Sequence, residues 1–129
     1  MPYVLMVDDE PDSCEFVTKF LTQHGFRTHC ASNGREALSH LMLRAPDAVV
    51  LDVRMPEMDG ITLLEVLRSY LRWHDLPVIL LTAHATPHDL DRAEQLGVSE
   101  VFRKANFKLV DLLESLRRVI PPSAKKNGA

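Results

Sequence analysis

Hydrophobic residues along the chain form short continuous runs that alternate with stretches of helical periodicity. The runs at Tyr3–Val7, Asp47–Val53, Pro77–Leu81 and Val98–Phe102 predict short β-strands. Three of these runs are too continuously apolar for a strand with one face in water, which predicts central strands. Phe26–Ala31 instead alternates apolar and polar side chains, a pattern typical of an edge strand.

Five stretches outside the strands have the pattern of amphipathic helices. Asn33 is suited to begin the second helix, and Thr86 followed by Pro87 is suited to begin the fourth. Gly25 and Gly97 stand where the first and fourth helices would end. Apolar stripes mark the first, second, third and fifth helices. In chain order they are Cys14, Val17 and Leu21; Ala37, Leu38, Leu41 and Met42; Ile61, Leu64, Leu67 and Leu71; and Leu109, Leu113, Leu116 and Ile120.

The order strand then helix, repeated five times, predicts an α/β fold. Such an alternation requires parallel strands joined by right-handed crossovers, with helices on both faces of a doubly wound five-stranded parallel sheet. We expect one domain over residues 1–120 and a flexible, polar C-terminal tail over residues 121–129, after the last helix meets Pro121. In sheets of this kind, functional residues gather at the carboxyl ends of the strands.

Composition and charge narrow the class of protein. With 129 residues, 46% hydrophobic and 26% charged, the chain is sized for one globular domain. A net charge of -3 without a basic stripe argues against direct nucleic-acid binding. No apolar run is long enough to span a membrane and no secretion signal is present, so we expect a cytoplasmic location. Cys14 and Cys30 lie in periodic apolar segments, which favours reduced, buried thiols over the alternative, a disulfide between them.

Polar residues that could carry chemistry follow four of the five predicted strands. They are Asp8, Asp9 and Glu10 after the first strand, Asp52 at the end of the third, Thr82 after the fourth and Lys104 past the fifth. Two carboxylates ~4 Å apart repel by about 4 kcal/mol at an effective dielectric constant near 20, so the acids need a cation among them. Oxygen ligands of this kind suit Mg2+, and the lysine would add a further positive charge.

Each of these residues also has a purely structural interpretation. The acids from Asp8 to Glu10 could cap the following helix, and on their own they favour that role. Thr82 could be a hydrogen-bonded strand end, and Lys104 an exposed loop residue. Asp52 favours function, because a carboxylate that ends an apolar strand costs free energy unless it is paired or used. Their joint placement at one edge favours a site.

Four motifs in this order resemble the signature of bacterial response-regulator receiver domains. They are VDDE at Val7–Glu10, LDVRMPEMDG at Leu51–Gly60, LLTAHA at Leu80–Ala85, and Lys104 after the fifth strand. The resemblance spans Tyr3 to Ile120. It implies the flavodoxin-like strand order 2-1-3-4-5, the order of the chemotaxis receiver.

The resemblance implies that Asp52 is a phosphoacceptor that works with Mg2+. Asp9 and Asp52 would bind the metal directly, Asp8 would bind it partly through water, and the backbone carbonyl of Arg54 would complete the protein ligands. The resemblance thus implies phosphorelay signalling rather than turnover of an external substrate.

Three further groups would hold the phosphoryl oxygens. The resemblance assigns Lys104, the hydroxyl of Thr82 and the backbone N–H of Ala83 to this task. The implied partners are a sensor histidine kinase or phosphotransfer protein, and either a downstream effector protein or an output domain outside this sequence. The sequence predicts no membrane or nucleic-acid partner and leaves homodimer formation open.

The chain departs from the family pattern at two positions near the lysine. Most relatives carry an aromatic residue where Val101 stands, and a proline where Ala105 follows Lys104. These changes keep open an alternative, a receiver-like binding module that works without phosphorylation. An aspartate-nucleophile hydrolase is disfavoured because Val53 and Arg54 after Asp52 do not match the DxDx[TV] pattern, and a nucleotide carrier because the phosphate-cradling glycine loop is missing.

Overall fold

A five-stranded parallel sheet forms the centre of the molecule, with the strand order predicted from the resemblance. A computed structural model describes residues 1–120, and the predicted tail at 121–129 lies outside the described residues. The strands lie in the order β2-β1-β3-β4-β5. Their bounds are β1 Tyr3–Val7, β2 Arg27–Ala31, β3 Ala48–Leu51, β4 Val78–Thr82 and β5 Glu100–Arg103.

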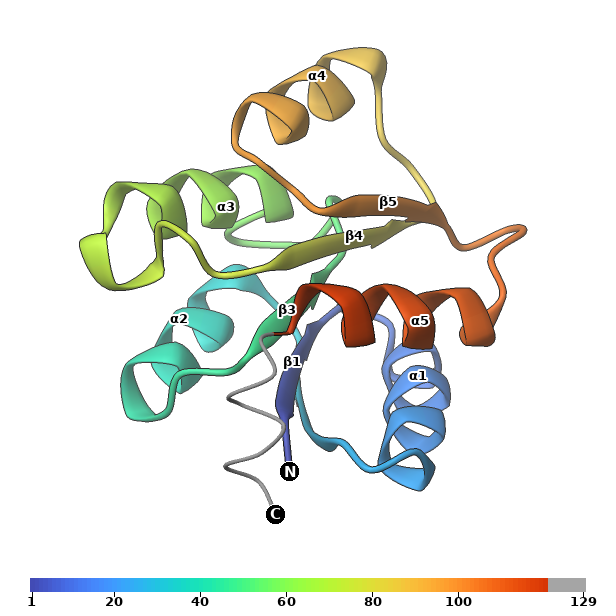
Figure 1. The fold of residues 1–129 in the computed structure, drawn as a ribbon. Helices are drawn as coiled ribbons and strands as arrows, with labels where there is room; N and C mark the ends of the chain where they lie inside the picture. Colours follow the sequence, from blue (N-terminus) through green and yellow to red (C-terminus); the bar gives the residue numbers. More distant parts are fainter. Residues whose placement is uncertain (121–129) are drawn as a thin grey trace.

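Helices cover both faces of the sheet (Figure 1). They are α1 Pro11–Gln23, α2 Gly34–Leu43, α3 Gly60–Ser69, α4 Pro87–Gln95 and α5 Leu109–Val119, with a short 3-10 turn, η1, at Leu71–Trp73. α1 and α5 pack on one face over a core that includes Val4, Met6 and Val50. α2, α3 and α4 pack on the other face, over a core that includes Leu5 and Leu80. The predicted doubly wound fold is therefore confirmed.

The burial of the strands agrees with their predicted places in the sheet. β3 and β4 are buried along their whole length, and β1 is buried from its second residue, since both faces are covered by helices. β2 and β5 form the two edges, and their residues alternate between more and less exposed. The alternation in the sequence therefore identified the β2 edge correctly.

The predicted helix boundaries at polar and glycine residues are also confirmed. Asn33 and Thr86 are the N-caps of α2 and α4, and each side chain accepts a hydrogen bond from the backbone in the first turn. Gly25 and Gly97 follow the ends of α1 and α4 with φ of 89° and 75°. A side chain is strained in that left-handed conformation, which is why glycine suits both positions.

The third helix is shorter than its apolar stripe predicts. Leu71 was expected on the buried face, but α3 ends at Ser69 and Leu71 lies in η1 with 87% of its surface exposed. Trp73, two residues later, is buried in its place. The backbone carbonyl of Trp73 accepts a hydrogen bond from the guanidinium of Arg68, and this contact holds the turn against the end of the helix.

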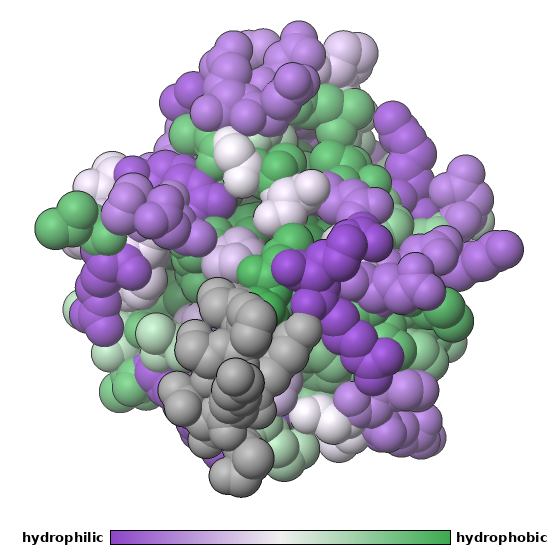
Figure 2. Space-filling model, viewed as in Figure 1, coloured by the Kyte–Doolittle hydropathy of each residue, from purple (hydrophilic) through white to green (hydrophobic). Residues whose placement is uncertain are grey.

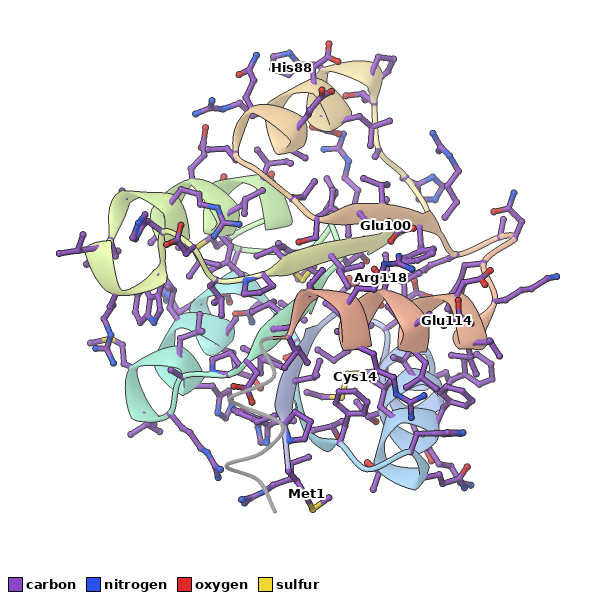
Figure 3. All side chains as sticks on the ribbon, in the orientation of Figure 1. Met1, Cys14, His88, Glu100, Glu114 and Arg118 are labelled. Atoms are coloured by element: carbon purple, nitrogen blue, oxygen red, sulfur yellow. A yellow bond between two sulfur atoms is a disulfide. The ribbon has the colours of Figure 1, made fainter. Side chains whose placement is uncertain are left out.

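The two cysteines form a disulfide, so the prediction of reduced thiols is wrong. Cys14 on α1 and Cys30 on β2 are joined with their Cα atoms 6.3 Å apart, within the range that a disulfide spans. Figure 3 labels Cys14, which lies below α5 in that view. The sequence did not show this pairing, because it depends on how closely α1 packs against the edge strand.

The surface in the view of Figure 2 is mostly hydrophilic, especially over α4, with hydrophobic residues visible between the elements. On the same side Arg118 of α5 pairs with Glu100 of β5 at 3.0 Å, and Figure 3 labels both residues. Among residues 1–120, no helix combines the length and the apolar character needed to cross a membrane.

Candidate functional site

Two buried carboxylates lie side by side at the carboxyl edge of the sheet. Asp8 directly follows β1 and Asp52 directly follows β3, and these strands are neighbours in register from Val4 to Val7. Asp8 and Asp52 are 2% and 4% exposed, respectively. The backbone N–H of Asp52 donates to the carbonyl of Val7 at 2.9 Å, which continues the ladder and fixes the acid at the strand end.

Lys104 brings a positive charge to these acids from β5. Its backbone N–H donates to the carbonyl of Thr82 at 3.1 Å, so the residue is held beside the end of β4. Its Nζ lies 2.7 Å from Asp8 Oδ2, 3.0 Å from Glu10 Oε1 and 3.3 Å from Asp52 Oδ2. One ammonium group therefore contacts three carboxylates, which is the clustering that the strand-end argument predicts.

Thr82 supplies a hydroxyl on the other side of Asp52. This residue ends β4 and is 1% exposed, and its Oγ1 donates to Asp52 Oδ1 at 3.0 Å. The same oxygen accepts a hydrogen bond from the backbone N–H of His84 at 3.3 Å. Asp52 thus has a hydroxyl at one oxygen and an ammonium group at the other.

The surroundings of Asp52 and Lys104 change their protonation in a consistent way. Burial raises the pKa of Asp52 above its usual value, and the neighbouring Asp8 adds to this, while the charge of Lys104 and the hydrogen bond from Thr82 oppose it. Burial alone would lower the pKa of Lys104, but its contacts with Asp8 and Glu10 outweigh burial and raise it. Lys104 is therefore positively charged, and Asp52 is a carboxylate buried away from water.

The loop after Asp52 is shaped by close packing. A Cβ at Gly60 would collide with the backbone carbonyl of Asp52, so glycine allows α3 to begin directly against the site. Asp59 caps this helix by accepting a hydrogen bond from the backbone N–H of Thr62 at 2.9 Å. The backbone N–H of Arg54 donates to Asp52 Oδ1 at 3.3 Å, which holds the start of the loop to the acid.

The side chain of Arg54 leaves the site and reaches α4. Its Nη2 lies 2.7 Å from Asp89 Oδ2, and Asp89 is the residue whose carboxylate also accepts from the backbone N–H of Thr86 in the capping box. The loop after the buried acid is thereby tied to the first turn of α4. The sequence did not indicate this contact.

The acids present are suited to a divalent cation. Asp8, Glu10 and Asp52 each offer a carboxylate oxygen, and these oxygens lie within 4.8 Å of one another. Asp8 Oδ2 is buried and receives no hydrogen bond of good geometry, although Lys104 Nζ stands 2.7 Å away as an ion-pair partner. A buried carboxylate oxygen with no directed donor is a natural metal ligand, and hard oxygen donors suit Mg2+.

The membership of this acidic cluster differs from the set implied by the resemblance. Asp9, expected to bind the metal directly, is exposed and stands outside the cluster, although it lines a shallow pocket together with Asp8. Glu10, which the sequence interpretation left out of the metal ligands, lies inside the cluster because its backbone N–H donates to Asp8 Oδ1 at 2.9 Å. The run of three consecutive acids was the only sequence signal that could have indicated the place of Glu10 in the cluster.

Three further positions singled out in the sequence are Ala83 after β4, Val101 on β5 and Ala105 after Lys104. Ala83, assigned a backbone contact by the resemblance, is exposed directly after Thr82. Val101 is 37% exposed on β5, while Phe102, the next residue, packs against the core beneath α1 and α5. The bond from Lys104 to Ala105 is trans, as are all the peptide bonds of the described residues.

A family comparison decides the class of this domain. The sequence model described as "Response regulator receiver domain" matches residues 4–117. The chain belongs to the response regulator receiver family. The predicted domain limit at residue 120 lies just past this match, and the assignment of residues 121–129 to a tail stays a prediction.

Receiver sequences of known proteins agree with this assignment. The chain is 46% identical over 123 residues to the regulatory protein AtoC of Escherichia coli K12, covering 95% of this chain and 26% of AtoC. It is 34% identical over 126 residues to the response regulator MprA of Mycolicibacterium vanbaalenii, covering 98% of this chain and 53% of MprA. The chain therefore spans only a quarter to about half of these two relatives.

Solved receiver structures share the fold. The signal receiver domain of a signal transduction histidine kinase from Syntrophus aciditrophicus has a TM-score of 0.84 at 35% identity, covering 93% of this chain and 90% of that one. The chemotaxis protein CheY4 of Vibrio cholerae has a TM-score of 0.84 at 29% identity, covering 92% of this chain and 98% of that one. The receiver domain of a two-component response regulator is thus the class of this chain.

Proposed function

We propose that this receiver domain accepts a phosphoryl group on Asp52 in a phosphorelay. The observation that carries the proposal is the setting of one carboxylate, 4% exposed, between the hydroxyl of Thr82 at 3.0 Å and the ammonium of Lys104 at 3.3 Å. A carboxylate buried at a strand end costs free energy unless it has a use, and these two donors are those needed to hold a phosphoryl group.

The transfer is a displacement at phosphorus by an oxygen of Asp52. With a phosphohistidine donor, the new O–P bond forms as the N–P bond of the donor breaks, and the departing imidazole nitrogen keeps the electron pair and takes a proton. Such transition states are loose, so catalysis consists of positioning and charge neutralisation. Lys104, the Thr82 hydroxyl and the Ala83 N–H would hold the phosphoryl oxygens in the product.

A divalent cation completes the proposed site. Asp8, Asp9 and Asp52 with the Arg54 carbonyl are the proposed protein ligands, and the clustering of Asp8, Glu10 and Asp52 within 4.8 Å supports a metal at this edge. Bound Mg2+ supplies positive charge to the transferring phosphoryl group. Lys104 would release part of its present contact with the carboxylates and pair with a phosphoryl oxygen.

The proposed partners follow from the family. A sensor histidine kinase or a phosphotransfer protein would supply the phosphoryl group in the cytoplasm. The signal would pass to an effector protein or to an output domain outside this sequence, in keeping with AtoC and MprA, which are longer than this chain. The domain promotes its own phosphorylation and dephosphorylation, and no external substrate is turned over.

The test is phosphorylation by a small-molecule donor. Acetyl phosphate with Mg2+ should add one phosphoryl group to the wild type and none to Asp52→Asn, as measured by intact-protein mass spectrometry. Asp91→Asn, an exposed acid on α4, is a matched control that should label like the wild type. Equal labelling of the wild type and Asp52→Asn would reject the assignment of the acceptor.

A further inference from the structure

Two histidines from different elements meet at the β2 edge of the sheet. His29 lies on β2 and His40 on α2. Their Nε2 atoms are 2.9 Å apart, and the ring centroids are 3.9 Å apart with planes inclined at 54°. The proposed phosphorelay chemistry uses neither residue.

A carboxylate stands beside His40 at helical spacing. Glu36 lies one turn before His40 on α2, and its Oε1 is 3.8 Å from His40 Nε2. The other oxygen, Oε2, accepts a hydrogen bond from the hydroxyl of Ser32 at 2.7 Å. This hydrogen bond is the main reason that the pKa of Glu36 is lowered, so the group is a carboxylate at neutral pH with one oxygen held by Ser32 and the other facing His40.

We propose that His29 and His40 together bind a transition-metal ion of the Zn2+ class. Imidazole nitrogen is a preferred ligand of Zn2+, Ni2+ and Cu2+. Mg2+ prefers oxygen ligands, so this site differs in chemistry from the acidic cluster. Water would fill the remaining coordination positions.

The spacing of the two nitrogens agrees with shared coordination. Ligands about 2.0–2.1 Å from one metal ion are separated by about 2.9 Å at a right angle and about 3.4 Å at a tetrahedral angle. The observed 2.9 Å between the Nε2 atoms lies at the lower limit of this range. A hydrogen bond between the two neutral rings accounts for the contact without metal, and the ion would replace the shared proton.

The site also has a ligand-orienting contact and an open approach. Ser32 holds the carboxylate of Glu36 beside His40, where it would accept a hydrogen bond from a water molecule on the ion. The side chains of His40 and Glu36 are 28% and 42% exposed, and His29 is exposed on the edge strand. An ion can therefore reach the nitrogens without opening the fold.

Calorimetric titration with Zn2+ tests the proposal, in excess Mg2+ so that the acidic cluster is occupied. The wild type should bind one Zn2+, and His29→Ala and His40→Ala should each lower the affinity by about tenfold or more. His74→Ala is the matched control, because His74 is an exposed histidine whose Nε2 also neighbours a carboxylate, that of Asp75 at 3.3 Å. Its affinity should stay within about twofold of the wild type.

A second measurement needs no substitution. In a spectrum of the histidine side-chain nitrogens, Zn2+ should shift the resonances of His29 and His40 and leave those of His74 in place. Unchanged affinity in both His29→Ala and His40→Ala, or unshifted resonances of the pair in the wild type, would overturn the site. Loss of folding in a variant, seen by circular dichroism, leaves the decision to the spectrum of the wild type.

Discussion

Asp52 is held in a setting that makes its negative charge costly to the folded protein. Burial and the nearby Asp8 raise its pKa more than Lys104 and Thr82 lower it. The folded state therefore keeps the proton to a higher pH than the unfolded state does. Stability tied to this group is complete below the unfolded pKa and is lost as the pH rises through the folded pKa.

Replacing Asp52 with Asn should therefore stabilise the metal-free protein at neutral pH. The neutral amide can still accept the hydrogen bond from Thr82, and it removes a charge that burial disfavours. We expect a gain of about 1 kcal/mol in the free energy of unfolding near pH 7 that shrinks toward about pH 4, measured by urea unfolding. A gain that grows as the pH falls would contradict the raised pKa. Asp91→Asn should show no such pH-dependent gain.

Asp9 and Glu10 can be separated by their effects on metal affinity. The resemblance assigns Asp9 to the metal, whereas Glu10 has a carboxylate 62% exposed whose contact is with Lys104. We predict that Asp9→Asn weakens Mg2+ binding at least about tenfold and Glu10→Gln by about twofold or less, measured by calorimetry. The reverse order would mean that the cluster of Asp8, Glu10 and Asp52 is itself the metal ligand set.

The first helix is joined to the edge strand by the disulfide of Cys14 and Cys30. The residues are 16 apart in sequence, and a crosslink that closes a loop of this length stabilises a protein by about 3 kcal/mol through the entropy of the unfolded chain. Reduction of the wild type by dithiothreitol should lower the free energy of unfolding by about this amount.

The matched control for this prediction is the double variant Cys14→Ser/Cys30→Ser. Its stability should be insensitive to dithiothreitol and close to that of the reduced wild type. Thiol titration of the unfolded wild type should detect two thiols after reduction and none before it. Equal stability of the wild type with and without reductant would contradict the prediction.

Local patterns predicted the elements well where a boundary depends on neighbouring residues. The bounds of β1 agree with the predicted Tyr3–Val7, and the caps at Asn33 and Thr86 are where the sequence places them. Boundaries that depend on tertiary packing were not predicted. The end of α3 before Leu71 depends on Arg68 and Trp73 meeting in space, which no local pattern reports.

The candidate site was predictable because a topological rule applies to it. Residues after parallel strands meet at one edge, so Asp8, Asp52 and Lys104 could be placed together from their positions alone. The rule does not predict which side chains in a run of adjacent acids face the site and which face solvent. Asp9 points to solvent and Glu10 returns to the cluster because of the bond from the Glu10 N–H to Asp8.

The fold connects the acidic edge to α4 through two separate contacts with Asp52. Thr82 links the acid to the end of β4, from which the chain runs through Ala83 to the N-cap of α4. Arg54 links the loop after the acid to Asp89 in the first turn of the same helix. A phosphoryl group on Asp52 would compete for the Thr82 hydroxyl and so act on the start of α4.

Amide exchange can therefore distinguish a phosphorylation-dependent domain from an inert binding module. Beryllium fluoride with Mg2+, a mimic of the bound phosphoryl group, should change the exchange rates over residues 83–90 and 104–107 by roughly fivefold or more. The far ends of α2 and α5 should exchange as before, because they lie away from the carboxyl edge. Asp52→Asn with the same additions is the control and should show no change. Unchanged protection in the wild type throughout these segments would favour the inert module.

The same measurement on Arg54→Ala tests how the signal reaches α4, since Val101 stands in place of the usual aromatic residue. In this variant, a change in exchange confined to residues 104–107 would identify the Arg54–Asp89 contact as the route to α4.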